Sequence, residues 1–265
     1  MKIGEFIPNR LSKRLIRILY LHYLLRSDIN FFKILWAIIL NRKIIRGDYI
    51  LSNYGVWMFN REEDRTFRLS ILGYRNNLEK ILSSIIEPTI FLDIGANQGV
   101  FSLVAAANQS IVEIHSFEPN IKICEFLQLN FVVNNVTNYT IHEVAVSTKG
   151  SSMNFLVPKN HSGAGKISPQ ESNMTIRTVN RAYLDEHFAK TYIPFFVKID
   201  VEGHELEVLQ ELFKSKICMS IQKIYLEIIR DNRNEATTLQ ILRDNGFNEK
   251  FRKSNPISYD ALFVR

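Results

Sequence analysis

Two apolar runs that each end in an acid constrain the fold of this 265-residue chain more than any other feature. The first run, 90–92, ends at Asp93 and leads into a glycine-rich turn and a helix of small residues over 99–107. The second run, 111–117, ends at Glu118. This order predicts two β–α units whose carboxylates lie at the ligand-binding edge of an open α/β sheet. We expect an adenosine-type cofactor there, because carboxylates accept hydrogen bonds from ribose hydroxyls and glycines permit close backbone approach.

The sequence of the glycine-rich turn disfavours one common nucleotide-binding motif and excludes another. Counted from Gly95, the second and third glycines of G-x-G-x-x-G would fall on Asn97 and Val100, which disfavours a dinucleotide cofactor. No Gly-Lys-Ser or Gly-Lys-Thr follows the turn, so a P-loop is excluded. The remaining pattern, D-x-G-x-N-x-G over 93–99, resembles motif I of the S-adenosylmethionine-dependent methyltransferases. Taken alone, it fits equally an α/β turn that binds no ligand.

A third segment makes the resemblance more specific. An apolar strand over 195–199 is followed by an acidic turn and an amphipathic helix. With the first two motifs, it is similar to the FkbM family of methyltransferases. The resembling stretches are DIGANQG at 93–99, FEPN at 117–120, VAVS at 144–147, KIDVEGHELEVL at 198–209 and YLEI at 225–228. They span 89–247, and together they are far more specific than any one of them.

The resemblance implies an α/β, Rossmann-like class I methyltransferase fold. This is a mostly parallel seven-stranded sheet with helices on both faces, here with an N-terminal helical extension. We divide the chain into a basic helical extension (1–48), a hairpin and helix leading into the core (49–88) and a methyltransferase domain (89–265). Apolar periodicity predicts a helix over 69–86 and a single strand over 139–146.

The resemblance also implies the residues that hold S-adenosylmethionine. These are Asp93, Gly95, Ala96, Asn97, Gly99, Glu118, Pro119, Asn120, Ala145 and Asp200. Residues 158–173 have turn composition and the length of a binding loop. Within that loop we expect His161 and Ser162 to contact the methyl acceptor.

Four candidate catalytic residues lie at or just after the carboxyl ends of the fourth and fifth strands of the core. They are Asp200, Glu202, His204 and Glu227. Each can act as the base that takes a proton from an acceptor hydroxyl, and the carboxylates can instead cap the next helix. Asp200, Glu202 and Glu227 can alternatively bind a divalent cation such as Mg²⁺, and the sequence does not choose between these roles.

Three neighbouring residues are expected outside this catalytic group. We expect Glu205 and Glu207 to lie on the surface. Lys198 is expected to be structural, paired with a nearby acid.

The charge distribution disfavours a nucleic-acid substrate. The net charge is +6, yet residues 1–50 alone carry +7, so the rest of the chain carries −1. A nucleic-acid methyltransferase would need a basic face on the domain that presents its substrate. The two cysteines make neither a disulfide framework nor a zinc cluster, which fits a reducing, cytoplasmic setting.

The extension 1–48 mixes basic and apolar residues at helical spacing. Its longest apolar run, 31–40, is too short to span a bilayer, and Arg17 interrupts the earlier run in a way that a signal peptide does not. Two interpretations remain open. The extension packs on the core or forms a homodimer contact, or it rests on the inner, anionic face of a membrane.

The acceptor is predicted by family analogy alone. We expect O-methylation of a sugar hydroxyl in a bacterial surface polysaccharide or a related glycan. The alternatives are O-methylation of a small natural product, or a non-catalytic cofactor-binding scaffold on the same fold.

Overall fold

The computed structural model describes residues 45–73, 76–230, 234–254 and 256–265. The chain divides into two compact units, Met1–Tyr74 and Arg75–Arg265. The predicted helical extension over 1–48 lies almost wholly outside the described residues. Within the described ranges, no helix has both the length and the apolar character needed to cross a bilayer.

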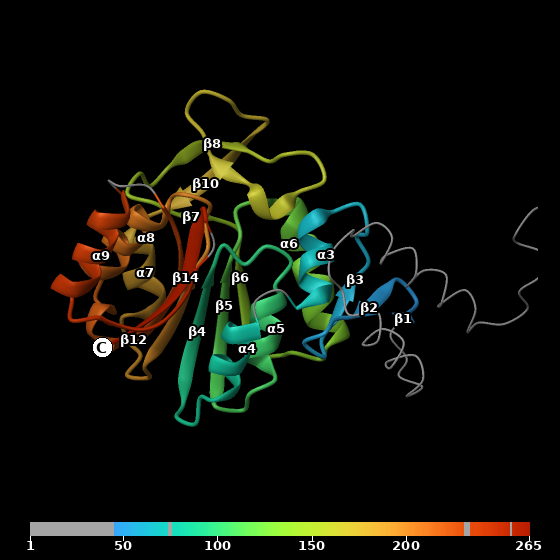
Figure 1. The fold of residues 1–265 in the computed structure, drawn as a ribbon, viewed down its shortest axis with the longest axis horizontal. Helices are drawn as coiled ribbons and strands as arrows, with labels where there is room; N and C mark the ends of the chain where they lie inside the picture. The colour runs from blue at the N-terminus through green and yellow to red at the C-terminus, as the bar shows by residue number, and fades with distance from the viewer. Residues whose placement is uncertain (1–44, 74–75, 231–233, 255) are drawn as a thin grey trace, which may run out of the picture. The chain divides into compact units, whose positions relative to one another are not determined.

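A seven-stranded sheet with the order β13-β14-β12-β11-β4-β5-β6 forms the larger unit (Figure 1). Its parallel strands are β4 (Thr89–Ile94), β5 (Ile111–Phe117), β6 (Tyr139–His142), β11 (Phe195–Ile199) and β12 (Ile221–Ile229). An antiparallel hairpin of β13 (Asn248–Ser254) and β14 (Ser258–Val264) completes one edge. The predicted mostly parallel seven-stranded sheet is therefore confirmed.

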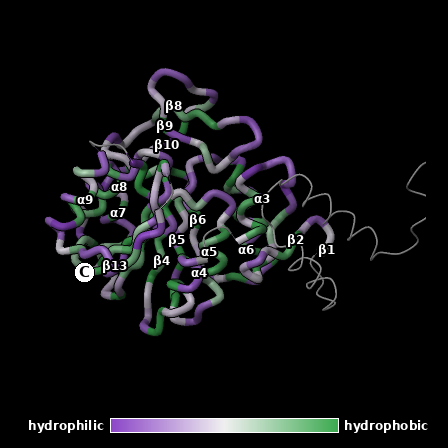
Figure 2. The backbone as a smooth tube through the Cα atoms, in the orientation of Figure 1, coloured by the Kyte–Doolittle hydropathy of each residue, from purple (hydrophilic) through white to green (hydrophobic). Residues whose placement is uncertain are grey.

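Helices cover both faces of this sheet, as Figure 1 shows. One face carries α4 (Asn76–Ser83), α5 (Val100–Ala106) and α6 (Ile121–Val133). The other carries α7 (Arg181–Phe188), α8 (Glu205–Lys214) and α9 (Asn234–Asp244), with a short 3₁₀ turn η3 (Cys218–Ser220) before β12. All side chains of β4 and β11 are buried, which is the pattern of strands covered on both faces. Figure 2 shows hydrophobic residues along these central strands.

A second sheet stands beyond the end of β6 and has the order β7-β10-β8-β9. Its strands are β7 (Ala145–Val146), β8 (Ser152–Leu156), β9 (Lys166–Ile167) and β10 (Met174–Val179), with the 3₁₀ turn η2 (Ser162–Ala164) between β8 and β9. The predicted single strand over 139–146 is therefore wrong. The His142 carbonyl accepts hydrogen bonds from the N–H groups of Glu118 and Val144, and the chain turns there toward β10.

Within residues 45–73, the smaller unit contains a three-stranded antiparallel sheet and the helix α3 (Arg65–Leu72). The strands are β1 (Ile45–Arg46), β2 (Tyr49–Leu51) and β3 (Trp57–Phe59), and the antiparallel pair β2–β3 confirms the hairpin predicted within 49–88. The predicted continuous helix over 69–86 is wrong. Gly73, with φ +70°, ends α3 in a left-handed cap, and α4 begins at Asn76.

Candidate active site

The glycine-rich turn 95–99 joins β4 to α5 at the carboxyl edge of the sheet. Gly95 has φ +81°, and a Cβ atom at this position would lie 1.9 Å from the backbone oxygen of Asp200. The N–H groups of Gly95 and Ala96 both donate to the Phe117 carbonyl, at 3.0 and 2.9 Å. Only glycine fits this position, because the turn is held tightly between the ends of β5 and β11.

Glu118 follows β5 and is buried under the same turn. Its two carboxylate oxygens accept hydrogen bonds from the N–H groups of Asn97 and Asn120, each at 2.9 Å. Burial raises the pKa of Glu118 to about 7, although these N–H groups and the nearby Lys198 ammonium oppose the shift. Each oxygen retains a lone pair that can accept a hydrogen bond from a ligand hydroxyl.

Asp93 is tied to the interior. One carboxylate oxygen accepts from Lys198 Nζ at 2.8 Å and the other from Ser102 Oγ at 2.7 Å. Lys198 Nζ also donates to the Gly95 carbonyl at 2.8 Å and lies 3.8 Å from a carboxylate oxygen of Asp200. The predicted pairing of Lys198 with an acid is confirmed. Asp93 therefore holds the glycine turn through Lys198, and its direct contact with a cofactor stays a prediction.

The other residues predicted to hold the cofactor have separate structural tasks. Gly99, with φ +79°, precedes α5, and a Cβ atom there would lie 2.0 Å from Leu127 Cδ1. Asn120 caps α6, because its side-chain oxygen accepts from the N–H of Lys122 at 3.2 Å. Pro119 lies between Glu118 and that cap, and Ala145 lies on β7.

Three of the predicted catalytic residues converge. Asp200, Glu202 and Glu227 each offer a carboxylate oxygen, and these oxygens lie within 4.8 Å of one another. Glu202 has φ +54°, and Glu227 Oε1 accepts from Ser258 Oγ at 2.7 Å. The three oxygens are the ligand type that Mg²⁺ prefers. A cation bound there would offset the mutual repulsion of the three carboxylates.

His204, the fourth predicted catalytic residue, lies at the start of α8 with both ring nitrogens near a partner. Nε2 lies 3.0 Å from Ser147 Oγ, and Nδ1 lies 3.5 Å from a carboxylate oxygen of Glu207. Burial lowers the pKa of His204, and the Glu207 carboxylate opposes the shift. Burial therefore favours the neutral ring, and its action as a base stays a prediction.

The loop 158–173 contacts the glycine turn. Ser162 Oγ donates to the side-chain oxygen of Asn97 at 3.1 Å, and His161 is the residue before η2. Ser162, predicted to contact the acceptor, is thus placed beside the predicted cofactor residues. Contact of either residue with an acceptor stays a prediction.

Glu205 corrects the sequence analysis, which places it on the surface. Only 8% of this residue is exposed, and its carboxylate accepts hydrogen bonds from the N–H groups of Gly203 and Val201. Burial raises the pKa of Glu205 to about 7. Its position in an amphipathic helix gave no signal for this contact, because the side chain reaches back to the turn before α8.

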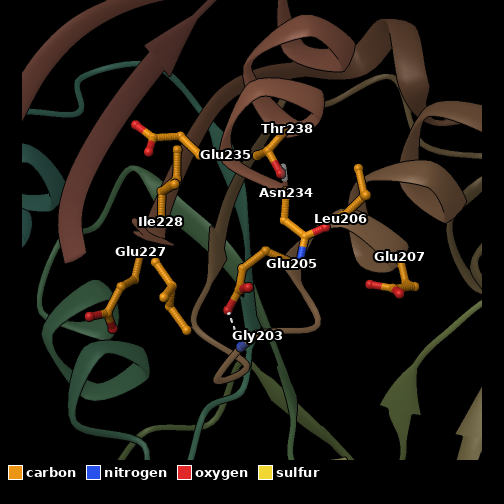
Figure 3. A pocket seen from close by; sticks show the side chains of 10 residues that line it. Gly203, Glu205, Leu206, Glu207, Glu227, Ile228, Asn234, Glu235 and Thr238 are labelled. Carbon is orange, nitrogen blue, oxygen red and sulfur yellow. Dashed lines mark hydrogen bonds between the residues drawn. The ribbon is translucent and has the colours of Figure 1, made fainter. Parts of the chain in front are cut away.

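A hollow of about 200 Å³ opens beside the acidic turn, between α8, α9 and the end of β12 (Figure 3). Polar side chains in its wall come from Glu205, Glu207, Glu227, Asn234, Glu235 and Thr238. Leu206, Ile228 and Ile229 add apolar surface. Glu227 belongs both to this wall and to the three converging carboxylates, so the hollow adjoins the candidate catalytic group.

Comparison with known proteins identifies relatives of this chain. The family profile described as "Methyltransferase FkbM domain" matches residues 93–249. The hexuronic acid methyltransferase AglP of Haloferax volcanii is 27% identical over 179 residues, which cover 67% of this chain and 72% of AglP.

Solved structures show more distant similarity. The precorrin-6y C5,15-methyltransferase of Geobacter metallireducens has a TM-score of 0.41 at 13% identity, covering 71% of this chain and 87% of that one. M. jannaschii TYW2 in complex with AdoMet has a TM-score of 0.42 at 13% identity, covering 84% of this chain and 90% of that one.

Gly95 and Gly246 have nearly the same φ, so their alanine variants test how closely the turn 95–99 approaches the backbone at Asp200. We expect Gly95→Ala to lower the free energy of unfolding by about 1–3 kcal/mol more than Gly246→Ala does. Gly246 has φ +80°, and a Cβ there would have no neighbour nearer than 3.9 Å. Urea unfolding followed by circular dichroism measures both losses. Equal losses would contradict the tight packing of the turns.

Lys198→Met tests the buried ammonium. We expect it to cost about 3–5 kcal/mol of unfolding free energy, because the Asp93 carboxylate would stay buried without its cation. Lys122→Met, which changes an exposed lysine of α6, should alter stability by less than about 0.5 kcal/mol. Urea unfolding measures both, and a loss below about 1 kcal/mol for Lys198→Met would show that Asp93 does not need this partner.

Proposed function

The chain belongs to the FkbM methyltransferase family, and on that premise we propose that it transfers the methyl group of S-adenosylmethionine to a hydroxyl group of a sugar. The name of its relative AglP, a hexuronic acid methyltransferase, supports a sugar as the acceptor. We propose a sugar of a bacterial surface polysaccharide or related glycan. The observation that carries the proposal is the meeting of the glycine turn, the buried Glu118 and three carboxylates at one edge of the sheet.

The residues at the glycine turn fit the adenosine part of this cofactor. Glu118 is a buried carboxylate with lone pairs left for two ribose hydroxyls. Gly95 keeps the turn free of a side chain, so a ligand can approach its backbone closely. Ser162, bonded to Asn97, would bring the loop 158–173 over the bound cofactor.

The hollow beside α8 and α9 fits a sugar acceptor. Its carboxylate, amide and hydroxyl groups can pair with sugar hydroxyls, and its isoleucine and leucine side chains can contact the C–H face of a sugar ring. Because Glu227 borders the hollow, a hydroxyl bound there would lie next to the converging carboxylates.

Bound S-adenosylmethionine supplies a methyl group on a positively charged sulfur, which the acceptor oxygen attacks in line with the departing sulfur. The protein contributes mainly by holding the two reactants in that alignment. A carboxylate of the group Asp200, Glu202 and Glu227 accepts the proton that the hydroxyl loses. If Mg²⁺ binds, the same three side chains would hold it, and it would make the hydroxyl more acidic.

Residues 1–48 carry an excess of basic residues. Their basic character supports a peripheral contact with an anionic membrane surface, which would suit a lipid-linked acceptor on the cytoplasmic side. A homodimer contact is the alternative, because mixed basic and apolar helices also occur at protein interfaces.

Cofactor binding should depend on pH through Glu118. Hydroxyl donors bind its ionised form, so affinity is full above the pKa of about 7 and falls below it. Calorimetric titration with S-adenosylhomocysteine should show about tenfold weaker binding at pH 6 than at pH 8, and no binding of NAD. Glu118→Gln should bind weakly at both pH values. Absence of binding to the wild type would overturn the cofactor assignment, and pH-independent binding would remove Glu118 from the ribose site.

Turnover should depend on Glu227. We expect Glu227→Gln to lower methyl transfer to glycan extracts by about a hundredfold or more without weakening S-adenosylhomocysteine binding, because it removes a base. Glu249→Gln, in the exposed Glu249–Arg252 pair on β13, is the control and should match the wild type. A chelator added to the wild type separates the two roles of the acids: loss restored by Mg²⁺ indicates a cation, and no effect indicates a base. Wild-type turnover in Glu227→Gln would contradict both.

A further inference from the structure

The turn that carries Asp200 and Glu202 has an unfavourable backbone conformation. Glu202 has φ +54° and Gly203 has φ +100°. A left-handed conformation is unfavourable for a residue with a Cβ atom, so other contacts must hold it. Where Asp200 and Glu202 point therefore depends on what fixes residues 200–203.

Glu205 fixes this turn from the side of the hollow. Its Oε1 accepts from the N–H of Gly203 at 3.0 Å, the bond drawn in Figure 3, and from the N–H of Val201 at 3.4 Å. On its other side the turn lies against Gly95, where a Cβ atom would be 1.9 Å from the Asp200 carbonyl oxygen. The turn is thus held between a glycine and a buried carboxylate.

The Glu205 carboxylate supports the turn more than its own helix. A carboxylate at a helix start usually accepts N–H groups of the first helical turn. Glu205 is the first residue of α8, yet besides its own N–H its carboxylate accepts from two N–H groups that precede the helix. The cap residue, His204, makes no capping hydrogen bond with its side chain. In this geometry the Glu205 carboxylate holds the turn that bears Asp200 and Glu202, and we call its hydrogen bonds to the Val201 and Gly203 N–H groups the brace.

We propose that Glu205 is a positioning residue for methyl transfer: it holds the turn 200–203 so that the Asp200 and Glu202 carboxylates meet Glu227 beside the hollow. The inference rests on the proposed function. Glu205 itself need not touch the reacting atoms, because both hydrogen bonds go to the backbone of the turn.

Protonation should weaken this brace. Burial raises the pKa of Glu205 to about 7, against the N–H groups that the carboxylate accepts. An ionised carboxylate accepts stronger hydrogen bonds than a protonated one, so the brace is full above this pH and weakens below it. The other titratable groups facing this place are Asp200 on the turn, Glu207 on α8, Glu227 on β12 and Glu235 on α9.

Two substitutions separate a brace from a general stabilising contact. Glu205→Ala removes the hydrogen-bond acceptor, whereas Glu205→Gln keeps an oxygen that can accept both N–H groups but cannot ionise. Glu79→Ala, which removes an acid from the first turn of α4, is the control for losing a helix-start acid. Each variant is compared with the full wild-type chain by turnover at saturating cofactor, S-adenosylhomocysteine affinity and amide exchange of the turn.

We expect Glu205→Ala to lose at least tenfold in turnover, to keep cofactor affinity within about threefold, and to exchange the Val201 and Gly203 amides faster. Because Gln is neutral, like protonated Glu, Glu205→Gln should show at pH 8 about the turnover that the wild type has below pH 7, above that of Glu205→Ala, and should lack the wild type's fall between these pH values. Wild-type turnover in a folded Glu205→Ala would overturn the proposal, as would unchanged amide exchange. If Glu205→Ala does not fold, the pH profile of Glu205→Gln decides, and a profile equal to that of the wild type overturns the proposal.

The outcomes distinguish this inference from the proposed function. A wild type that binds S-adenosylhomocysteine but methylates no sugar would overturn the sugar acceptor. The amide exchange of the Gln and Ala variants would still show whether Glu205 holds the turn, because that measurement needs neither acceptor nor turnover.

Discussion

The site depends on one buried ammonium group. Lys198 lies near the carboxyl end of the fully buried strand β11, opposite Asp93 on β4 in the parallel register. An isolated charge there would be strongly destabilising, so its bonds to the Asp93 carboxylate and the Gly95 carbonyl are needed to compensate the lost hydration. The Lys198 ammonium thus contacts Asp93 on β4 and the Gly95 carbonyl, and it lies near the Asp200 carboxylate. It therefore links the glycine turn 95–99 to the turn 200–203.

In both halves of the site, a buried carboxylate accepts hydrogen bonds from backbone N–H groups of a turn. On the cofactor side, Glu118 is buried and accepts the N–H group of the left-handed residue Asn97 together with that of Asn120. On the acceptor side, Glu205 is buried and accepts N–H groups on both sides of the left-handed residue Glu202. Burial raises the pKa of each carboxyl to about 7. Each turn thus has an unfavourable backbone held by a buried acid whose charge varies near neutral pH.

Several elements could be predicted because their signals are local. The apolar runs that end at Asp93 and Glu118 specify parallel strands, and the acids after the later strands place Asp200, Glu202 and Glu227 at one edge. Other elements could not. The helix predicted across Gly73 is wrong, because Gly73 ends α3 in a left-handed cap. The strand predicted over 139–146 is wrong, because the chain turns after His142, where the Val144 N–H donates back to the His142 carbonyl, and residues 145–146 pair with β10 instead.

Hydrophobic periodicity and strand-end motifs lie within short stretches of chain, so they predict the family, the order of the core strands along the chain and the acids that meet. Such stretches do not contain the partners of these acids, which the fold alone brings close to them. Asp93 pairs with Lys198, which lies 105 residues further along the chain, so this predicted cofactor residue also holds the glycine turn through Lys198. The sequence predicts that Glu205 is a surface residue of an amphipathic helix, yet its side chain is buried against the turn before that helix. Partners, burial and the pKa shifts they cause arise only when distant strands are brought together.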